Sequence, residues 1–257
     1  TTATGGAGPR APFGRRLAHA METAGPLCLG VDPHPGLLRQ WGLSDTPAGL
    51  EAFSLTALEA AVGPEGPRVA AIKPQVALYE RHGSAGLAAL ERLLAAARDA
   101  GVLTIADAKR GDIGSTMDGY AAAWIADASP LAADAVTLSP YLGFGTLVPT
   151  IRAAHEAGRG VFVLALTSNP EGREVQHVGE GSAEGSVARR IAGAAAAENA
   201  ALRGDDAWGP VGLVLGATVA AEADRLGLDL PALGGPLLAP GFGAQGATAR
   251  GMRADFG

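Results

Sequence analysis

Two short segments of this chain carry the residue types best suited to holding and transferring a proton. The 257 residues include only two lysines, Lys73 and Lys109, against 18 arginines. A guanidinium stays protonated, whereas the pKa of an ammonium is readily tuned by its surroundings. Both lysines lie at the ends of apolar, strand-like runs, residues 69–75 and 103–109. Their rarity and placement therefore indicate a chemical role at both positions.

The second lysine belongs to an alternating array of acids and base, Asp107-Ala-Lys109-Arg-Gly-Asp112. Positions two apart share a face of a strand, so Asp107 and Lys109 are expected to project together. Asp112 lies beyond Gly111, in the turn before the next helix, and could face another site. Such an array suits a reaction in which a carbanion forms and is then protonated by the ammonium. An ion-pair network without catalysis is the alternative that spacing alone leaves open.

Strand-like runs alternate with helical segments along the whole chain. Runs rich in Val, Ile and Leu, without polar alternation, predict a parallel sheet that is buried on both faces. The expected strands lie near residues 27–32, 69–75, 103–107, 135–140, 160–167, 211–216 and 237–241. Helical patterns lie between them near residues 49–62, 85–100, 115–128, 145–157, 183–202 and 219–226. An earlier helix near residues 13–23 is expected to close the bottom of the structure.

Polar residues at the ends of these strands distinguish between two α/β architectures. They follow nearly every strand, at Asp32, Lys73, Asp107, Lys109, Ser139, Ser168, Thr218 and Gln245. A doubly wound sheet gathers its site at one switch point, whereas a barrel collects groups from many strand ends. The sequence therefore predicts a (β/α)8 TIM barrel. Only seven strands can be counted, so the eighth is missing from the sequence, and we expect a further C-terminal segment.

Composition describes an ordinary globular chain and excludes several kinds of partner. Residues 1–12 are expected to form a flexible tail and residues 13–257 a single barrel domain, with a mobile loop near residues 171–185. The net charge of −6 gives no basic field for nucleic acid. No apolar stretch is long enough to span a bilayer. The single cysteine, Cys28, excludes an internal disulfide, is expected to be a buried structural thiol, and favours a reducing cytoplasm.

A glycine-rich turn after the last strand predicts an anion site. In the segment 240–246, Pro-Gly-Phe-Gly-Ala-Gln-Gly, the glycines would let backbone N–H groups approach a phosphate at a helix N-terminus. The turn lacks the lysine of a nucleotide-hydrolysing P-loop, so that class is not indicated. The histidines show no metal-ligand spacing, and no metal site is predicted.

Several motifs together resemble orotidine 5′-phosphate decarboxylases. Asp107-Ala-Lys109-Arg-Gly-Asp112-Ile113-Gly-Ser-Thr116 resembles the family's catalytic signature. The other matches follow in the family's order along the chain: Gly30-Val-Asp32-Pro33, Lys73-Pro-Gln75, Thr167-Ser168-Asn-Pro170 and the glycine-rich turn with Gly241, Gly243 and Gln245. The Thr-Ser-Asn-Pro turn is most similar to the longer bacterial (type 2) branch.

The resemblance implies a fold, a reaction and roles for particular residues. It implies a TIM barrel that converts orotidine 5′-monophosphate to uridine 5′-monophosphate in pyrimidine biosynthesis, without metal or organic cofactor. Lys109 would protonate C6 beside Asp107, and Asp112 would complete the array from the partner subunit of a homodimer, alongside Ile113 and Thr116. Asp32 and Lys73 would hold the ribose. Ser168 would meet the pyrimidine edge, and Gln245, with Gly241 and Gly243, would serve the base and the phosphate.

Three points qualify the resemblance. Family members pair the phosphate with an arginine near the eighth strand, which this sequence does not contain, and Arg250 and Arg253 are unconvincing substitutes. A related barrel that acts on a sugar phosphate with Mg²⁺ shares the Asp-x-Lys-x-x-Asp spacing, but a lysine at position 73 would oppose a cation there. An inactive barrel that binds nucleotides or partners is the third alternative, and the intact acid–lysine–acid array argues against it.

Overall fold

The computed structural model describes residues 10–242, 246 and 248–256, and its centre is a curled parallel sheet. Seven strands follow one another in the sheet in the order in which they occur in the chain. They are β1 (Cys28–Val31), β4 (Ala71–Pro74), β5 (Leu103–Arg110), β6 (Ala135–Leu138), β7 (Gly160–Leu166), β8 (Val211–Leu215) and β9 (Leu237–Leu238). All seven predicted strands are therefore confirmed, and every neighbouring pair in this sheet is parallel.

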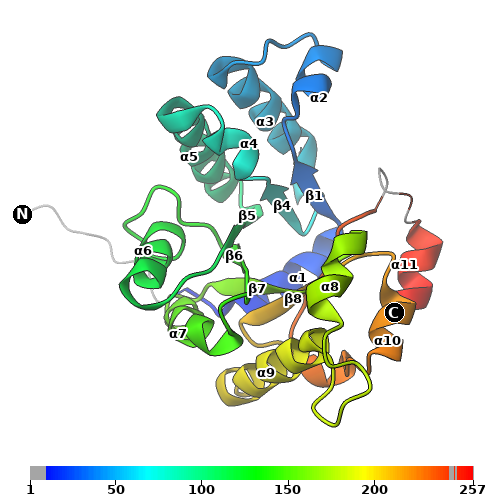
Figure 1. The fold of residues 1–257 in the computed structure, drawn as a ribbon. Helices are drawn as coiled ribbons and strands as arrows, with labels where there is room; N and C mark the ends of the chain where they lie inside the picture. Colours follow the sequence, from blue (N-terminus) through cyan, green and yellow to red (C-terminus); the bar gives the residue numbers. More distant parts are fainter. Residues whose placement is uncertain (1–9, 243–245, 247, 257) are drawn as a thin grey trace, which may run out of the picture.

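Helices ring this sheet on its outer side (Figure 1). The longer ones are α3 (Pro47–Ala61), α5 (Gly83–Asp99), α6 (Gly114–Trp124), α7 (Val148–Glu156), α9 (Val187–Leu202), α10 (Ala220–Arg225) and α11 (Ala249–Phe256). The alternation of parallel strands with covering helices confirms the predicted α/β barrel architecture, here as a half-barrel of seven strands. No described helix is both long enough and apolar enough to cross a membrane.

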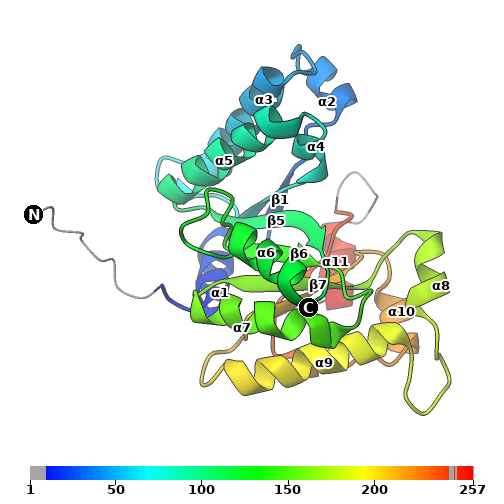
Figure 2. The ribbon, with the colours of Figure 1, turned by 60° about the vertical axis from the view of Figure 1, so that its left-hand side comes forward.

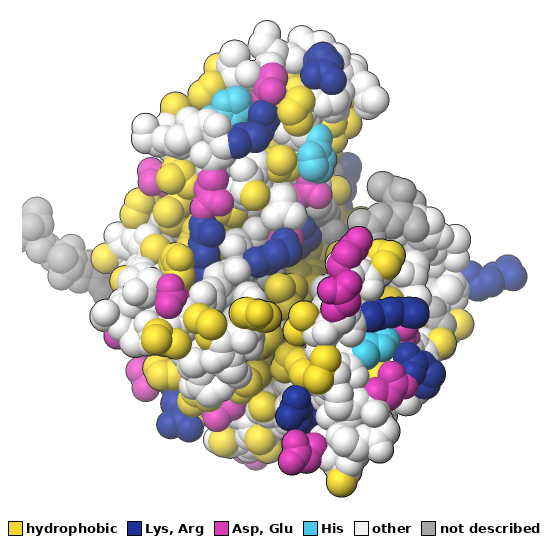
Figure 3. All heavy atoms as spheres, viewed as in Figure 1, with side chains coloured by type: hydrophobic (Ala, Val, Ile, Leu, Met, Phe, Trp, Pro, Cys, Tyr) yellow, Lys and Arg dark blue, Asp and Glu magenta, His cyan; other side chains and the backbone are white. Residues whose placement is uncertain are grey.

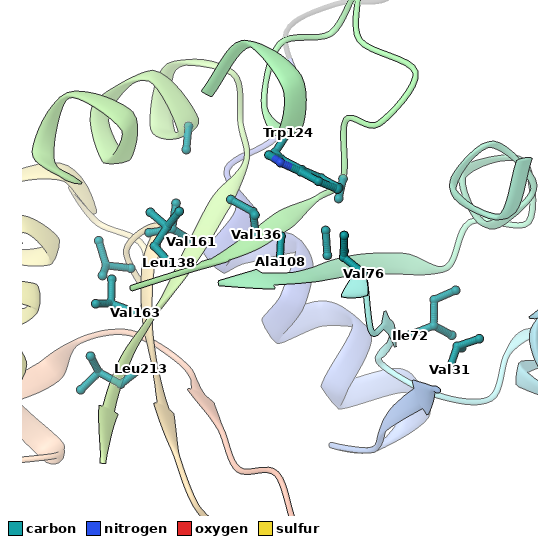
Figure 4. Packing of buried hydrophobic residues seen from close by; sticks show 14 of the residues in the cluster. Val31, Ile72, Val76, Ala108, Trp124, Val136, Leu138, Val161, Val163 and Leu213 are labelled. Atoms are coloured by element: carbon teal, nitrogen blue, oxygen red, sulfur yellow. The ribbon is translucent and has the colours of Figure 1, made fainter. Parts of the chain in front are cut away.

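The core lies between the sheet and this ring of helices. Buried side chains from neighbouring strands, such as Ile72, Val136 and Val163, pack together in one cluster that also includes residues of the helices (Figure 4). The β6 strand is buried at all four positions, as expected for a strand that is covered on both faces. The apolar runs of the sequence therefore form a scaffold that fixes the ends of the strands.

The first helix, α1 (Phe13–Ala24), closes the N-terminal end of the sheet as predicted. Phe13 packs edge-on against Phe162 of β7, with ring centroids 6.0 Å apart. Gly160 is required there, because a Cβ at this position would lie 2.2 Å from the Phe13 ring. In Figures 1 and 2, α1 lies partly behind the strands of the sheet. Ahead of α1, Arg10 donates to the Asp127 carboxylate and to the carbonyl of Ala157.

The structure also contains elements that the sequence patterns did not predict. They are α2 (Pro35–Gln40), α4 (Ala77–Glu80), the hairpin of β2 (Val62–Gly63) and β3 (Gly66–Pro67), and the single-turn helix η3 (Pro231–Leu233); the predicted helix near residues 145–157 begins as the single turn η1 (Phe144–Leu147). The segment 171–185 was expected to be an irregular loop, but part of it is helical, in η2 (Pro170–Gly172) and α8 (Arg173–Gln176). Each is too short to produce a periodic hydrophobic pattern, which explains why sequence reasoning missed them.

Candidate active site

Charged side chains from two adjacent strands meet at the C-terminal end of the sheet. Lys73 Nζ on β4 lies 2.9 Å from Asp107 Oδ2, and Lys109 Nζ lies 2.6 Å from Asp107 Oδ1. Asp107 is 9% exposed and Lys73 is 12% exposed, whereas Lys109 is 44% exposed. The predicted pairing of Asp107 with Lys109 is confirmed, and the structure adds Lys73 on the other side of the carboxylate. The more open ammonium belongs to Lys109, which leaves it accessible to a substrate.

Asp107 accepts four hydrogen bonds, two on each carboxylate oxygen. Besides the two ammoniums, Thr137 Oγ1 on β6 donates to Oδ1 over 3.0 Å, and Gln75 Nε2 donates to Oδ2 over 3.2 Å. A carboxylate that is fully supplied with donors is held in its ionised form and in one orientation. Asp107 is therefore a fixed negative charge beside the Lys109 ammonium.

The pKa values of Asp107 and Lys73 both shift in the direction that favours the charged form. Burial by itself would raise the pKa of Asp107, but the adjacent Lys73 and Lys109 ammoniums outweigh burial and lower it. Burial would lower the pKa of Lys73, but the Asp107 and Asp32 carboxylates outweigh it and raise that pKa. The site therefore stores opposite charges at close range in a largely dry environment.

Strand β5 departs from regular geometry where it presents these groups. Its register against β6 shifts between Ala106 and Arg110, and Lys109 has the left-handed φ of 49°. A left-handed backbone is uncommon for a residue with a Cβ, and such strain is concentrated at functional sites. The backbone N–H of Lys109 donates to Thr137 Oγ1 over 2.8 Å, which holds the distorted segment to β6. Simple alternation along a strand thus predicted the right neighbours without this bulge.

Gly111 allows the chain to leave β5 close to the next strand. A Cβ at this position would lie 2.3 Å from the carbonyl oxygen of Ser139, which follows β6. Only glycine permits this approach, so the passage from Lys109 to Asp112 depends on it.

Asp32 lies just beyond the end of β1, next to the array. It is close enough to Lys73 for its carboxylate to raise the pKa of that ammonium. Its Oδ1 is buried and has no hydrogen-bond partner among the described residues. A buried acceptor without a donor is costly, and each such atom calls for an explanation. A ligand hydroxyl at this position would supply the missing donor.

Cys28 lies beside the charged array without a described hydrogen bond to it, and several other predicted residues lie farther along the chain. Cys28 on β1 is partly buried, and burial raises the pKa of its thiol to about 12, which keeps it protonated and supports the structural reading. Asp112 precedes α6 and accepts a hydrogen bond from the backbone N–H of Ile113 over 2.8 Å. Ile113 is 60% exposed, and Thr116, in the first turn of α6, is exposed. The structure thus does not bring Asp112 onto Lys109 through any described contact within one chain.

The residues expected to meet the base and the phosphate lie at other strand ends. Ser168 is exposed just after β7, and Gly241, with φ of 123°, lies in the turn after β9. Gly243 and Gln245 lie outside the described residues. Figure 3 shows Lys and Arg side chains in a hollow at the middle of one face, bordered by apolar side chains. Within the described ranges, no group of three or more His, Cys, Asp or Glu side chains could hold a metal ion.

Two residues of the array were missed by sequence reasoning as functional groups. Gln75 was quoted only as part of a motif, although its amide reaches both Asp107 and, at 3.4 Å, Lys109 Nζ. Thr137 lies in an apolar strand, where a threonine carries no signal of function. The available signal was weak: Thr137 is the one polar residue of β6, and its side chain is 1% exposed. Its partners lie about 30 positions earlier in the chain and cannot be inferred from local spacing.

Comparisons with known proteins agree with this geometry. A sequence model of the orotidine 5′-phosphate decarboxylase / HUMPS family matches residues 25–255. Orotidine 5′-phosphate decarboxylase of Streptomyces coelicolor is 52% identical over 246 residues, which cover 96% of this chain and 84% of that protein. The enzyme of Salinispora tropica is 51% identical over 246 residues, covering 95% and 84%.

Solved structures give the same result at the level of the fold. A crystal structure from Streptomyces avermitilis, 52% identical, superposes with a TM-score of 0.87 and covers 97% of this chain and 83% of that chain. UMP synthase of Leishmania donovani, 31% identical, superposes with a TM-score of 0.75 over 95% of this chain and 48% of that chain. The chain, with its acid–lysine array at the barrel strand ends, belongs to the orotidine 5′-phosphate decarboxylase / HUMPS family.

Proposed function

We propose that the Lys73–Asp107–Lys109 array decarboxylates orotidine 5′-monophosphate to uridine 5′-monophosphate. The activity, that of a carboxy-lyase in pyrimidine biosynthesis, follows from family membership and from about 50% identity to proteins of that name. The observation that carries the assignment to particular residues is the buried Asp107 carboxylate, held by four donors, with the partly exposed Lys109 ammonium 2.6 Å away.

In this proposal, Lys109 supplies the proton and Asp107 shapes the charge around it. When the C6–carboxylate bond breaks, its electron pair stays on C6 and carbon dioxide leaves. The Lys109 ammonium stabilises the developing negative charge, then donates a proton to C6 and becomes a neutral amine that solvent reprotonates. Protonation of Asp107 would displace one of its four donors and would place a neutral acid between two ammoniums, so it stays ionised beside the departing carboxylate. The proposed reaction requires no metal or organic cofactor.

Asp32 and Lys73 are proposed to bind the ribose hydroxyls. The buried Oδ1 of Asp32 lacks a donor, and a hydroxyl would provide one. Lys73 already spans Asp107 and the region of Asp32, so the same ammonium would link the sugar to the catalytic carboxylate. We further propose that Ser168 meets the base and that Gly241, Gly243 and Gln245 serve the base and the phosphate.

The proposal is tested by following the absorbance change of orotidine 5′-monophosphate on mixing with the pure protein. Lys109→Ala is expected to lower kcat by at least about 10²–10⁴-fold, because the general acid is lost. Lys109→Arg is the matched control that keeps the charge, and it should be nearly as inactive, because a guanidinium does not release its proton at neutral pH. Activity close to that of the unaltered protein in either variant would remove Lys109 from the mechanism.

We also propose a homodimer in which Asp112, with Ile113 and Thr116, acts in the site of the partner subunit. The support is that Asp112 has no described contact with Lys109, while the adjacent Ile113 is exposed. Mixing inactive Lys109→Ala and Asp112→Ala proteins should then restore part of the activity, because mixed dimers contain one intact site. Mass spectrometry of the mixture shows whether the subunits have exchanged. If they have exchanged and no activity returns, the site is not shared.

The metal-dependent alternative is distinguished by a chelator. The Lys73 ammonium occupies the place where a cation would have to lie beside Asp107, 2.9 Å from its Oδ2. Activity is therefore expected to be unchanged in EDTA, and complete loss that Mg²⁺ restores would favour a sugar-phosphate reaction. We propose a cytoplasmic location, in line with the single cysteine of the chain.

A further inference from the structure

A large cavity lies at the opposite end of the sheet from the catalytic array. Its volume is about 1040 Å³, at the upper end of the range typical of small-molecule sites. Part of its lining comes from the segments that lead into four strands. One residue from each is Ala70 before β4, Val102 before β5, Asp134 before β6 and Arg159 before β7. Helix α1 and the β2–β3 hairpin complete the wall. None of these residues belongs to the catalytic site.

The charge of this cavity is opposite to that of the chain as a whole. Five of the 18 arginines line it, against two acids, although the net charge of the chain is −6. The arginines are Arg10, Arg16, Arg68, Arg98 and Arg159. One of the two acids, Asp134, is already engaged by Arg16 at 2.5 Å and by Thr104. Arg10 and Arg159 share a second carboxylate, that of Asp127 outside the lining. The positive charge that no described ion pair offsets therefore lies on Arg68 and Arg98.

Arg159 places a buried positive charge in the wall of the cavity. Its side chain is 4% exposed, and its two terminal nitrogens bind Asp127 and the carbonyl of Ala133. The third nitrogen, Nε, is buried and has no partner among the described residues. Burial outweighs the Asp127 carboxylate and lowers the pKa of this guanidinium. Because Nε is shielded from solvent, an anion in the cavity would stabilise this buried guanidinium through its charge and not through a hydrogen bond to Nε.

Two further arginines, at the edge of the cavity, are exposed and could bind an anion. Arg68, beside the β2–β3 hairpin, makes no ion pair with any described residue, and Arg98 at the end of α5 binds only the Ala132 carbonyl, at 3.3 Å. Both are exposed. Because they reach the cavity from different elements, a ligand that carries several negative charges would satisfy them together better than a single small anion.

The remaining walls suit an uncharged, flat group. Apolar residues on α1, α5 and the strand starts line the cavity, and they are Ala20, Ala24, Leu94, Val69, Val102 and Leu103. Inorganic phosphate alone would leave this surface unused, whereas an aromatic ring can pack on it and stack on a guanidinium. We propose that this cavity binds a nucleoside di- or triphosphate, with the phosphates on the arginines and the base on the apolar wall.

The proposal is tested by calorimetric titration of the full chain with ATP and with UTP in a magnesium-free buffer. Excess uridine 5′-monophosphate is included to occupy the catalytic site. One molecule is expected to bind per chain. The Arg68→Ala/Arg98→Ala double variant should weaken binding at least about tenfold, because charge-assisted hydrogen bonds are lost. Its decarboxylase activity without added nucleotide should be unchanged.

The Arg189→Ala/Arg190→Ala double variant is the matched control, since it also removes two positive charges, here from exposed positions on α9. This control should bind nucleotide as tightly as the unaltered chain does. An equal loss of affinity in the control would show that net charge alone explains the effect. Competition by uridine 5′-monophosphate would place the ligand in the catalytic site and overturn the proposal. Absence of binding at millimolar nucleotide would also overturn it. Pyrophosphate binding as tightly as ATP would overturn the assignment of a nucleotide.

Discussion

The two ends of the sheet are both rich in cations, but they use different ones for different purposes. At the C-terminal end, both lysines of the chain surround the Asp107 carboxylate. At the N-terminal end, five arginines line a cavity and lysine is absent from its lining. An ammonium can give up a proton and a guanidinium cannot at neutral pH. The same scaffold therefore holds a site equipped for proton transfer at one end and a site of permanent charge at the other.

The surroundings of the charges differ as well. Asp107 has four donors from three strand segments, so its orientation is fixed before any substrate arrives. At the cavity, Arg159 Nε has no hydrogen-bond partner and Arg68 no ion pair among the residues that the structure describes. The catalytic array is internally satisfied, apart from Asp32 at its edge, whereas the cavity is left short of negative charge. The contrast fits the two proposals: a carboxylate oriented in advance for catalysis at one end, and arginines able to bind an anion at the other.

The largest effect that separates the two ends is expected from Asp107→Asn. The variant leaves two ammoniums without their carboxylate, and kcat should fall about 10³-fold, equivalent to about 4 kcal/mol in the barrier. The pKa of Asp107 is lower in the folded than in the unfolded chain, so its stabilising contribution is present above the unfolded value, near 3.8, and is lost as pH falls through the folded value. Urea unfolding at pH 7 should show a destabilised variant, and the difference should shrink at acid pH. A pH-independent difference would contradict the assigned electrostatics.

A smaller effect, of a different kind, is expected from Phe13→Ala at the N-terminal end. Phe13 is 1% exposed and packs on Phe162, so its removal opens a cavity and should lower the free energy of unfolding by about 3 kcal/mol. Measured well below the unfolding transition, kcat should be unchanged, because none of the four hydrogen bonds that hold Asp107 comes from α1. Reduced kcat in the folded variant would show that the two ends are coupled.

The smallest effect is expected from Thr137→Val, which preserves shape and removes one hydroxyl. The Lys109 N–H and the Asp107 carboxylate each lose a partner, so stability should fall by about 1–2 kcal/mol. The activity should fall as well, since the left-handed segment at Lys109 is no longer held. Thr137→Ser keeps the hydroxyl and is the control, measured by urea unfolding and steady-state kinetics. Equal behaviour of the two variants would show that the hydroxyl positions nothing.

Much of the fold and the nearest neighbours of the site followed from sequence patterns. Runs of Val, Ile and Leu are local signals, and they located all seven strands and the helix that closes the bottom. Asp107 and Lys109 are two positions apart, so their pairing was also a local inference. Single turns such as α4 and α8, of 4 residues each, were missed because a single turn has no measurable period. The position of Asp112 in a partner's site remains a prediction.

The sequence by itself determined which residues could do the chemistry, because residue type and short-range spacing are written in the chain: two rare lysines, the acids beside Lys109, and the strands that end at them. Only the tertiary structure decided that Lys73, Gln75 and Thr137 converge on one carboxylate and that the arginines line one cavity. These contacts join segments about 30 or more positions apart, and they depend on strand register and on the β5 bulge. Register follows from the packing of the whole sheet, so no local pattern contains it.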